Sequence, residues 1–486
     1  SSAASDVYKR QPQGTVAGVS GFQVHFGSHR ELNPGDYCDV LVAMNPAALK
    51  ANRKWLKPGA TVIIDGDSIT EDHLKKACFA TLDPIAELKL DEYNVVIPGI
   101  TTMTRDALRE TGLDNKSVTK CKNMFALGIC FYLFDRPEAY AFKYIETKFA
   151  KKNPAIAEAN KLAIQAGYNY AANTHQFANT YTVAPAPLEK GTYRSISGNV
   201  ATAWGLCAAA EKAGLPLFCG SYPITPATVI LEELAKRKDL GVKTVQAEDE
   251  IAGICTAIGA AFAGNFAVTT TSGPGLSLKS EALGLAVMTE LPLVVVDVQR
   301  GGPSTGLPTK TEQSDLSQAL YGRNGECPVI VVAASSPSDC FHYAFEAGRL
   351  AMEHMTPVIL LTDGFIANGS EPWRIPAMKD YPAITPPIVD EAPEGGFMPY
   401  VRNENLARGW AFPGKTGLEH RVGGLEKDCV KGCISHDPSN HQKMVRTRAE
   451  KVAKAVDDIP AQAVWGAPEG DLLVVGWGGT LSLIHI

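Results

Sequence analysis

The sequence predicts an α/β protein built from open, parallel sheets. Short apolar runs alternate with helical stretches along most of the 486 residues, and strand–helix–strand order at this spacing favours parallel pairing. Proline and glycine separate the runs, as turns between such elements require. Hydrophobic content of 45% and charged content of 20% are ordinary for a globular protein. A chain of this length can form two to four domains, each with its own core.

The first α/β domain is expected from about residue 21 onward. Asn45-Pro46 ends the first apolar run and opens a helix, and Pro58-Gly59 marks the turn into the next run. The stretch 122–134 is apolar nearly all round, which is typical of a buried helix. In chain order we expect strand 40–44, helix 46–56, strand 60–65, helix 69–82, strand 92–98, helix 122–134 and helix 138–165.

A second α/β domain is expected after a linker. Residues 168–192 carry Asn, Ala, Thr and Pro with almost no charge or periodicity, which indicates a connection between domains. Beyond it the alternation is regular, and Pro226 stands where a helix would begin. We expect helix 200–213, strand 215–219, helix 226–237, strand 244–247, helix 250–263, strand 266–271, helix 275–289, strand 291–298, strand 329–333, helix 337–353 and strand 356–362.

The remaining residues predict a boundary, an extension and the start of a third domain. Residues 376–398 are rich in proline and acidic residues, and a polar segment, 408–440, and a basic helix, 442–456, follow them. The apolar run 471–478 predicts a buried strand. The stretches 1–11 and 481–486 resemble translated sequencing adapters, so we expect the gene to continue past both ends. The alternative is a pair of genuine disordered tails.

Charge and cysteine usage exclude several classes of function. A net charge of −6 gives no electrostatic basis for binding nucleic acid or an anionic membrane, and no apolar run reaches the roughly 18–20 residues that span a bilayer. The eleven cysteines are scattered through mostly apolar segments, which favours a reducing, cytoplasmic setting. Cys429 and Cys433, with His420, His436 and His441 nearby, fit no standard zinc or cluster spacing, so no metal site is expected.

Polar residues follow four neighbouring strands of the second predicted domain. Open parallel sheets bind ligands at the carboxyl ends of their strands. These four groups are therefore expected to form one site, and they are Tyr222–Pro226, Asp249-Glu250, Thr270–Gly275 and Gln299–Pro303.

Glu250 is the most informative of these residues. The helix that follows it, 251–263, has no charged residue, which predicts a buried helix with a partly desolvated carboxyl group at its head. Burial favours the protonated acid, whereas the helix dipole favours the carboxylate. A carboxyl group balanced between these effects can share a proton with a ring nitrogen. The alternative is an ordinary acidic residue of a first helical turn, equivalent to Glu248 and Asp249.

Thr225 and Arg300 are the other two candidates. Pro223 and Pro226 stiffen the loop between them, which would present the Thr225 hydroxyl in one orientation. Alternatively, Thr225 caps a helix that begins at Pro226. Arg300 follows an apolar strand and is suited to clamp a carboxylate through paired N–H donors. Otherwise it is a routine surface arginine.

Four segments of the second domain closely resemble the α subunit of 2-oxoacid:ferredoxin oxidoreductases. They are YPITPAT, EDEIAGICTAIGAAFAG, TTTSGPGLSL and VVDVQRGGPSTGLPT, in this order. The segments NPAALKANRKWLKPGATVIIDGD and KNMFALG resemble the γ domain that is fused ahead of α in the version usually assigned to 2-oxoglutarate. The resemblance covers nearly all of residues 21–479, and four motifs in register make it specific.

The resemblance implies a mechanism and a set of roles. In this family thiamine diphosphate attacks the 2-oxoacid, CO2 leaves, electrons pass singly through iron–sulfur clusters to ferredoxin, and the acyl group goes to coenzyme A. Glu250 would hydrogen-bond the aminopyrimidine N1′ and favour the imino form that deprotonates the thiazolium C2. Thr225 and Arg300 would contact the carboxyl end of the 2-oxoacid. The site would be lined by Tyr222, Ile224, Ser272, Gly273, Pro274 and Gly275.

The resemblance also implies a partner subunit. The sequence lacks the Gly-Asp-Gly and Asn pattern that holds Mg2+ and the diphosphate in this family, and it lacks a Cys-x-x-Cys cluster. A β subunit would therefore supply the Mg2+ and diphosphate site and a [4Fe-4S] cluster, in a heterodimer or a dimer of heterodimers. The alternatives are an enzyme for pyruvate or branched-chain 2-oxoacids, or a non-catalytic scaffold that binds CoA or a nucleotide. Intact Thr225, Glu250 and Arg300 argue against the scaffold.

Domain names follow from the same resemblance. We expect a γ-type α/β domain at 12–167, incomplete at its N-terminus, a linker at 168–196, and a pyrimidine-type thiamine-diphosphate-binding domain at 197–376. A linker and extension at 377–460 and the start of a truncated transketolase C-terminal-like domain at 461–486 follow, with adapter-derived tails at 1–11 and 481–486.

Overall fold

The computed structural model describes residues 19–28, 31, 35–151, 153–177, 179–307, 310–462, 464 and 466–485. The chain forms two compact units, with the boundary between Glu189 and Lys190. Both units are built from parallel sheets and helices, so the α/β prediction is confirmed. Among the described residues no helix is both long and apolar enough to cross a bilayer.

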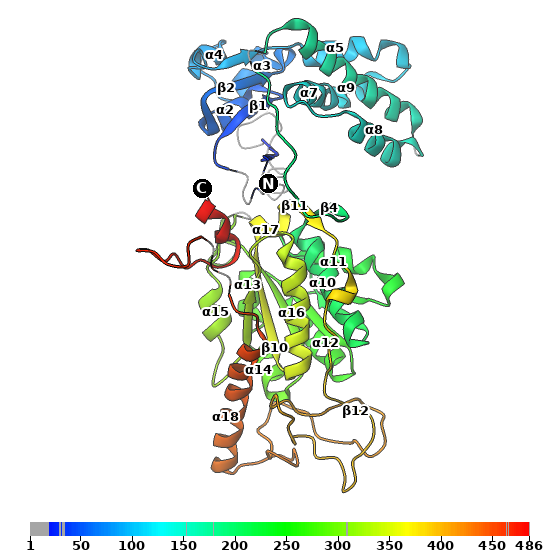
Figure 1. Ribbon diagram of the computed structural model, residues 1–486, viewed down its shortest axis with the longest axis vertical. Helices are drawn as coiled ribbons and strands as arrows, with labels where there is room; N and C mark the ends of the chain where they lie inside the picture. Colours follow the sequence, from blue (N-terminus) through cyan, green and yellow to red (C-terminus); the bar gives the residue numbers. More distant parts are fainter. Residues whose placement is uncertain are drawn as a thin grey trace. The chain divides into compact units, whose positions relative to one another are not determined.

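The first unit is a three-stranded parallel sheet with helices on it (Figure 1). The strands pair in the order β1 (Cys38–Ala43), β2 (Leu56–Ile64) and β3 (Asn94–Val96). The Asn45-Pro46 signal is confirmed, because the Asn45 side chain accepts a hydrogen bond from the amide of Ala48 at 2.8 Å and caps α2. The helices are α2 (Pro46–Asn52), α3 (Glu71–Lys76), α4 (Pro84–Glu87), α5 (Ile100–Ala107), α6 (Asn115–Lys120), α7 (Lys122–Leu133), α8 (Ala139–Ile145) and α9 (Pro154–Thr174).

The helix expected at 138–165 is two helices, α8 and α9, and two further features of this unit differ from the prediction. Helix α9 continues to Thr174, so residues 168–174, which were expected to be linker, are helical. Helices α5 and α6 were not predicted, because their threonines and charged residues give a weaker apolar pattern than their neighbours. The predicted buried helix at 122–134 is confirmed as α7, which packs closely on α9. Gly128 of α7 lies against the backbone of Ile164, and Gly167 of α9 lies against the backbone of Phe125.

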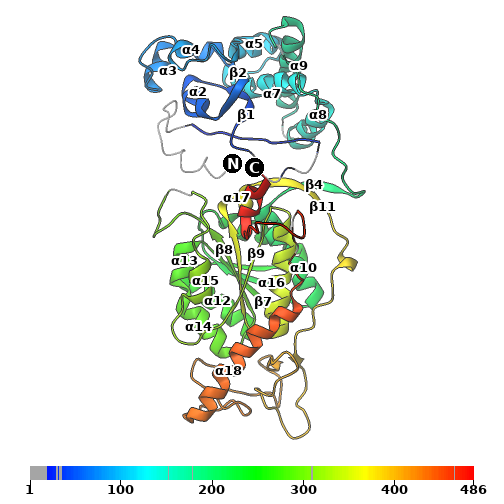
Figure 2. The ribbon, with the colours of Figure 1, turned by 60° about the vertical axis from the view of Figure 1, so that its left-hand side comes forward.

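The second unit contains a six-stranded sheet in which every pairing is parallel, in the order β6-β5-β7-β8-β10-β9. Helices cover both faces: α10, α11 and α16 pack on one side, and α12, α13 and α14 on the other (Figure 2). The strands are β5 (Leu217–Ser221), β6 (Lys243–Gln246), β7 (Phe266–Thr271), β8 (Leu293–Gln299), β9 (Ile330–Ala333) and β10 (Pro357–Asp363). The helices are α10 (Gly198–Ala213), α11 (Thr228–Ala235), α12 (Glu250–Phe262), α13 (Gly273–Leu278), α14 (Ser280–Thr289), α15 (Leu316–Tyr321), α16 (Asp339–His354) and α17 (Gly364–Asn368).

An antiparallel pair at the edge of this unit was not predicted. Strand β4 (Tyr193–Ser197) pairs with β11 (Ser370–Arg374), so the end of the predicted linker belongs to a sheet. The helix expected at 275–289 is also two helices, α13 and α14, which meet at Lys279. Lys279 is fully buried at this break.

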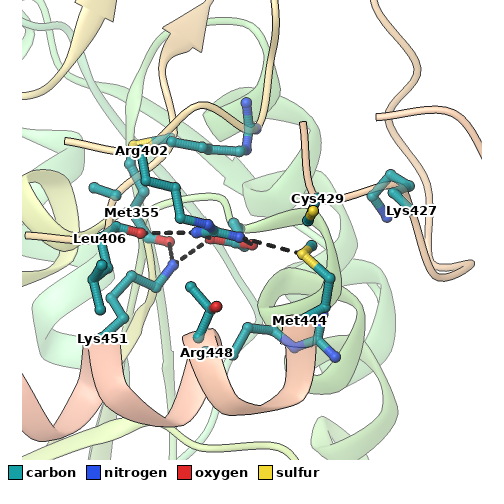
Figure 3. A network of polar contacts seen from close by, with 12 residues as sticks. Met355, Arg402, Leu406, Lys427, Cys429, Met444, Arg448 and Lys451 are labelled. Atoms are coloured by element: carbon teal, nitrogen blue, oxygen red, sulfur yellow. Dashed lines mark hydrogen bonds and ion pairs between the residues drawn. The ribbon is translucent and has the colours of Figure 1, made fainter. Parts of the chain in front are cut away.

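The segment after residue 377 is attached to the second unit by a buried charge cluster (Figure 3). It contains β12 (Ile388–Val389), β13 (Trp410–Ala411) and α18 (Pro438–Lys454). Glu290, at the end of α14, accepts two 2.7 Å hydrogen bonds from the guanidinium of Arg402 and one of 2.6 Å from Lys451 Nζ. The side chains of Glu290 and Lys451 are nearly inaccessible to solvent, and that of Arg402 is 11% exposed. The cluster therefore ties α14, the extension and α18 together.

The predicted strand at 471–478 is absent. The described residues there are irregular, and Leu472 and Val475 are 84% and 86% exposed. A strand needs a partner edge for its backbone groups, and none of the described segments pairs with this run. Residues 1–11 lie outside the described residues.

Candidate active site

The four predicted groups lie at one edge of the second sheet. Strands β6, β5, β7 and β8 are neighbours, and their registers pair Ser221 with Gln246 and Thr271 with Asp297. Parallel strands all end at the same edge. The loops that begin at Tyr222, Ser272 and Arg300 and the start of α12 therefore emerge side by side.

Glu250, Tyr222 and Gly275 converge at this edge. The Tyr222 hydroxyl lies 3.1 Å from Thr271 Oγ1. A Cβ at position 275 would come within 3.0 Å of Glu250 Cγ and would collide with the hydroxyls of Tyr222 and Thr271. Glycine is required here because three side chains approach its backbone. Burial, together with the nearby Glu250 carboxyl group, raises the pKa of Tyr222, so its phenol stays protonated at neutral pH.

Glu250 and Asp249 have different roles at the start of α12. The Asp249 side chain accepts a hydrogen bond from the amide of Ala252 at 2.8 Å, so Asp249 is the N-cap. Glu250 is the first residue of the helix, half-buried, with its side chain against Gly275. The two acids are therefore not equivalent in their contacts, and only Glu250 is placed in the group at the strand ends.

The expectation that α12 is a buried helix is wrong for one of its faces. Gly253, Ile254, Ala257 and Ala261 face the sheet, but the other side is open to solvent, and Ile251 is 50% exposed. Cys255 and Phe262 are exposed on the same helix. One face of this apolar helix is therefore exposed and is not covered by other described parts of the chain.

Arg300 and Thr225 are in direct contact through the backbone. Arg300 Nη1 donates a 2.7 Å hydrogen bond to the carbonyl oxygen of Thr225. Arg300 Nε is buried and has no partner among the described residues. The guanidinium has five N–H donors in a planar fork, so a donor remains for a further acceptor at this place.

The alternative role of Thr225 as a helix cap is wrong. Helix α11 begins at Thr228, not at Pro226, and has no side-chain cap. The hydroxyl of Thr228 instead accepts a 2.8 Å hydrogen bond from the amide of Ile224. Ile224 is half-buried and packs on the core, whereas Thr225 is exposed.

The loop before α13 covers a pair of buried carboxyl groups. Ser272 Oγ is fully buried and has no hydrogen-bond partner in the described part of the chain. A Cβ at Gly273 would lie 2.8 Å from Asp315 Oδ2. Asp297, on β8, is fully buried and neighbours Asp315. Burial, then the neighbouring Asp315 carboxyl group, raises the pKa of Asp297 well above its usual value, and burial raises that of Asp315. Burial and the closeness of the two groups therefore favour a proton on this pair.

Replacing Asp315 with Asn is expected to stabilise the chain at high pH. A carboxyl group with a raised folded-state pKa contributes stability that is present below its unfolded pKa and lost as pH rises through the folded value. An Asn amide donates to Asp297 without needing this proton. The free energy of unfolding of the variant should exceed that of wild type by about 1–3 kcal/mol at pH 8, and this difference should disappear towards pH 4. Thermal unfolding of the full chain between pH 4 and 8 measures it, with the exposed Asp239→Asn as the control. A variant less stable than wild type at pH 8 would contradict the shared proton.

Sequence reasoning missed Asp297, Asp315 and Lys279. Each is a polar or charged residue within or beside an apolar run, and the runs themselves were predicted. Among the described residues no three His, Cys, Asp or Glu side chains are grouped to hold a metal ion, and Cys429 and Cys433 are free thiols.

Comparisons with known proteins identify the family. The chain is 53% identical over 477 residues to the 2-oxoglutarate oxidoreductase subunit KorA of Mycobacterium tuberculosis, and the match covers 98% of this chain and 72% of that protein. The chain belongs to the 2-oxoacid:ferredoxin oxidoreductase family. Within this family it is 38% identical over 292 residues to the 2-oxoglutarate synthase subunit KorA of Methanothermobacter marburgensis, which covers 58% of this chain and 73% of that one.

Family models and a solved structure agree with this assignment. Residues 209–434 match the thiamine-diphosphate-binding family of pyruvate flavodoxin/ferredoxin oxidoreductases, and residues 4–170 match the pyruvate ferredoxin/flavodoxin oxidoreductase family. The 2-oxoglutarate:ferredoxin oxidoreductase from Magnetococcus marinus, solved with 2-oxoglutarate, coenzyme A and succinyl-CoA bound, superposes with a TM-score of 0.81 at 33% identity. The match covers 94% of this chain and 75% of the Magnetococcus marinus chain. The predicted family and the oxidoreductase class are thus confirmed.

Proposed function

We propose that this chain carries the aminopyrimidine and substrate side of a thiamine-diphosphate-dependent 2-oxoglutarate:ferredoxin oxidoreductase. The enzyme converts 2-oxoglutarate, coenzyme A and oxidised ferredoxin to succinyl-CoA, CO2 and reduced ferredoxin. The observation that carries the proposal is the half-buried Glu250 carboxyl group at the start of α12, set against Gly275 and the Tyr222 hydroxyl. The names of the two KorA relatives and the ligands of the Magnetococcus marinus enzyme support this substrate.

The residues at the strand ends fit the cofactor. Glu250 is suited to hold a proton shared with a ring nitrogen, because its carboxyl group is half-buried and Asp249, not Glu250, caps the helix. Gly275 leaves room for a flat ring beside Glu250 that a Cβ would fill. Ser272, Gly273 and Pro274, at the start of α13, are proposed to complete this wall. When bound, thiamine diphosphate supplies a nucleophilic carbon and an electron sink for decarboxylation.

Arg300 and Thr225 are proposed to hold the carboxylate next to the oxo group of the substrate. Arg300 is oriented by its bond to the carbonyl oxygen of Thr225, and the rest of its fork is suited to paired hydrogen bonds with a carboxylate. The exposed Thr225 side chain lies beside it. Tyr222 and Ile224 would line the site on the β5 side.

A β subunit is proposed to complete the site with Mg2+, the diphosphate pocket and a [4Fe-4S] cluster. The open apolar face of α12, formed by Ile251, Cys255 and Phe262, borders the candidate site. Leu278, at the end of α13, is also 53% exposed. Burying this surface against a second chain would stabilise the complex. The proposed assembly is a heterodimer, or a dimer of heterodimers, that works with ferredoxin in the cytoplasm.

Activity of the complex with several 2-oxoacids tests the proposal. The full-length gene is co-expressed with its β gene, and ferredoxin or viologen reduction is followed with coenzyme A and 2-oxoglutarate, pyruvate or a branched-chain 2-oxoacid. We expect kcat/KM to be highest with 2-oxoglutarate. A preference for pyruvate, the substrate in the names of both matching families, would correct the substrate. No reduction with any 2-oxoacid, despite bound thiamine diphosphate, would overturn the enzyme itself.

A further inference from the structure

A fully buried lysine lies directly behind the candidate site. Lys279 stands at the break between α13 and α14 and has no solvent-accessible surface. Its backbone amide donates to the carbonyl oxygens of Gly275 and Leu276, which ties it to the loop that carries Gly275. A buried ammonium group is costly unless it is paired or hydrogen-bonded. The ammonium group of Lys279 is therefore expected to have hydrogen-bond partners within the fold.

The Lys279 ammonium group contacts three segments that build the site. Nζ donates a 2.6 Å hydrogen bond to the backbone oxygen of Glu250 and a 3.3 Å hydrogen bond to Thr269 Oγ1. It also lies 5.1 Å from the centroid of the Tyr222 ring, within the range of a cation–π interaction. One side chain thus joins the first residue of α12, strand β7 and the loop after β5.

These contacts act on Glu250 and Tyr222 together. Lys279 binds the backbone carbonyl oxygen of Glu250, the residue whose carboxyl group is proposed to share a proton. Because this bond holds the backbone of Glu250, it also holds the position of the Cα atom from which the side chain extends. The Tyr222 hydroxyl and the Glu250 side chain both lie against Gly275. We propose that Lys279 is a positioning residue that holds Glu250 and Tyr222 in place for the cofactor through its buried ammonium group. This inference rests on the proposed function and concerns the geometry of that same site.

The charge of Lys279 is expected to be lost just above neutral pH. Burial lowers its pKa to about 8, although Glu250, Cys219, Cys255 and Asp249 act in the opposite direction. Cys219 stays a thiol over this range, because burial raises its pKa to about 12. Other neighbours, Thr269 and protonated Tyr222, carry no charge near pH 8. Deprotonation would remove the cation–π contact and weaken the bond to Glu250.

Two buried lysines of the same unit provide a matched experiment. Lys451 is also buried, and its pKa is also lowered to about 8 by burial. It contacts Glu290 at the end of α14, which precedes β8 and so lies at the opposite end of that strand from the site. Lys279→Met and Lys451→Met each remove one such ammonium group. A general loss of folding should affect both variants, whereas an effect on the site should be confined to Lys279.

The measurements are made on the complex with the β subunit. For Lys279→Met we expect thiamine diphosphate to bind about 10- to 100-fold more weakly. This is the loss expected when a residue that orients a ligand-binding residue through a hydrogen bond is removed. We expect kcat to fall by about 100-fold, as for a displacement of roughly 1 Å. The KM for the 2-oxoacid should stay near the wild-type value, because Lys279 contacts neither Arg300 nor Thr225. Lys451→Met should keep the wild-type Kd for the cofactor.

The pH dependence of the wild-type complex provides a second test that needs no variant. The Kd for thiamine diphosphate should increase as pH rises through about 8, and this increase should be absent in Lys279→Met. An unchanged Kd and kcat in a folded Lys279→Met complex would overturn the inference. So would a wild-type Kd that stays constant between pH 7 and 9.5. If the wild-type complex does not bind thiamine diphosphate at all, the proposed function fails instead.

Discussion

Replacing Glu250 with Gln is expected to lower turnover by about 10²- to 10⁴-fold, the range for a positioned group in proton transfer. The side chains have the same shape, so α12 and the contact with Gly275 should persist. The amide cannot share a proton with a ring nitrogen as a carboxyl group can. Ferredoxin or viologen reduction by the complex, with saturating cofactor and 2-oxoacid, measures the loss.

Asp249→Asn is the matched control for Glu250→Gln. It changes the neighbouring carboxyl group in the same way, and Asn retains the ability to cap α12 through its side-chain oxygen. The control should therefore keep close to wild-type activity and assembly. Equal losses in both variants would show that the acidic start of the helix matters as a whole. Full activity of Glu250→Gln would refute the role of this residue.

The strands of the site could be predicted because their apolar runs are continuous. Runs such as 266–271 and 291–298 are buried on both sides in a parallel sheet and need no alternation, and the structure places them at β7 and β8. Their order along the chain was enough to bring Glu250 and Arg300 to one edge. The sequence could not specify the start of α11, because Pro226 suits a turn as well as a first helical position.

Side chains buried by distant segments could not be predicted. Lys279 reads locally as a charged residue in a helix, and its partners Glu250 and Thr269 lie 29 and 10 residues away. The exposure of apolar residues on α12 could not be predicted either. Ile251 and Phe262 have the same apolar character whether their own chain or another one covers them. A single sequence does not separate these cases, because hydrophobicity is a property of the residue and burial is a property of the assembly.

The largest loss of stability is expected from Glu290→Gln. Glutamine leaves Arg402 and Lys451 in the buried cluster without their shared carboxylate (Figure 3). Breaking a buried ion pair by removing one partner costs about 3–5 kcal/mol, because the remaining charge stays desolvated. Burial alone would raise the pKa of Glu290, but Lys451 and Arg402 hold it well below its usual range. The contribution of the Glu290 carboxylate to stability is therefore fully present above the pKa of a glutamate in the unfolded chain, roughly 4.3. It is lost only as pH falls through the lower pKa that Glu290 has in the folded chain.

Urea unfolding of the full chain at pH 7 and at pH 3 measures this loss. The difference between wild type and Glu290→Gln should be full at pH 7 and smaller at pH 3, where the unfolded chain binds the proton that the folded wild type excludes. Glu71→Gln removes the exposed partner of Lys75 and should change stability little, because solvent screens such pairs. Lys451→Met should cost less than Glu290→Gln, since Arg402 still binds Glu290 through both nitrogens. Equal stability of Glu290→Gln and Glu71→Gln would mean that the cluster does not hold the extension on the second unit.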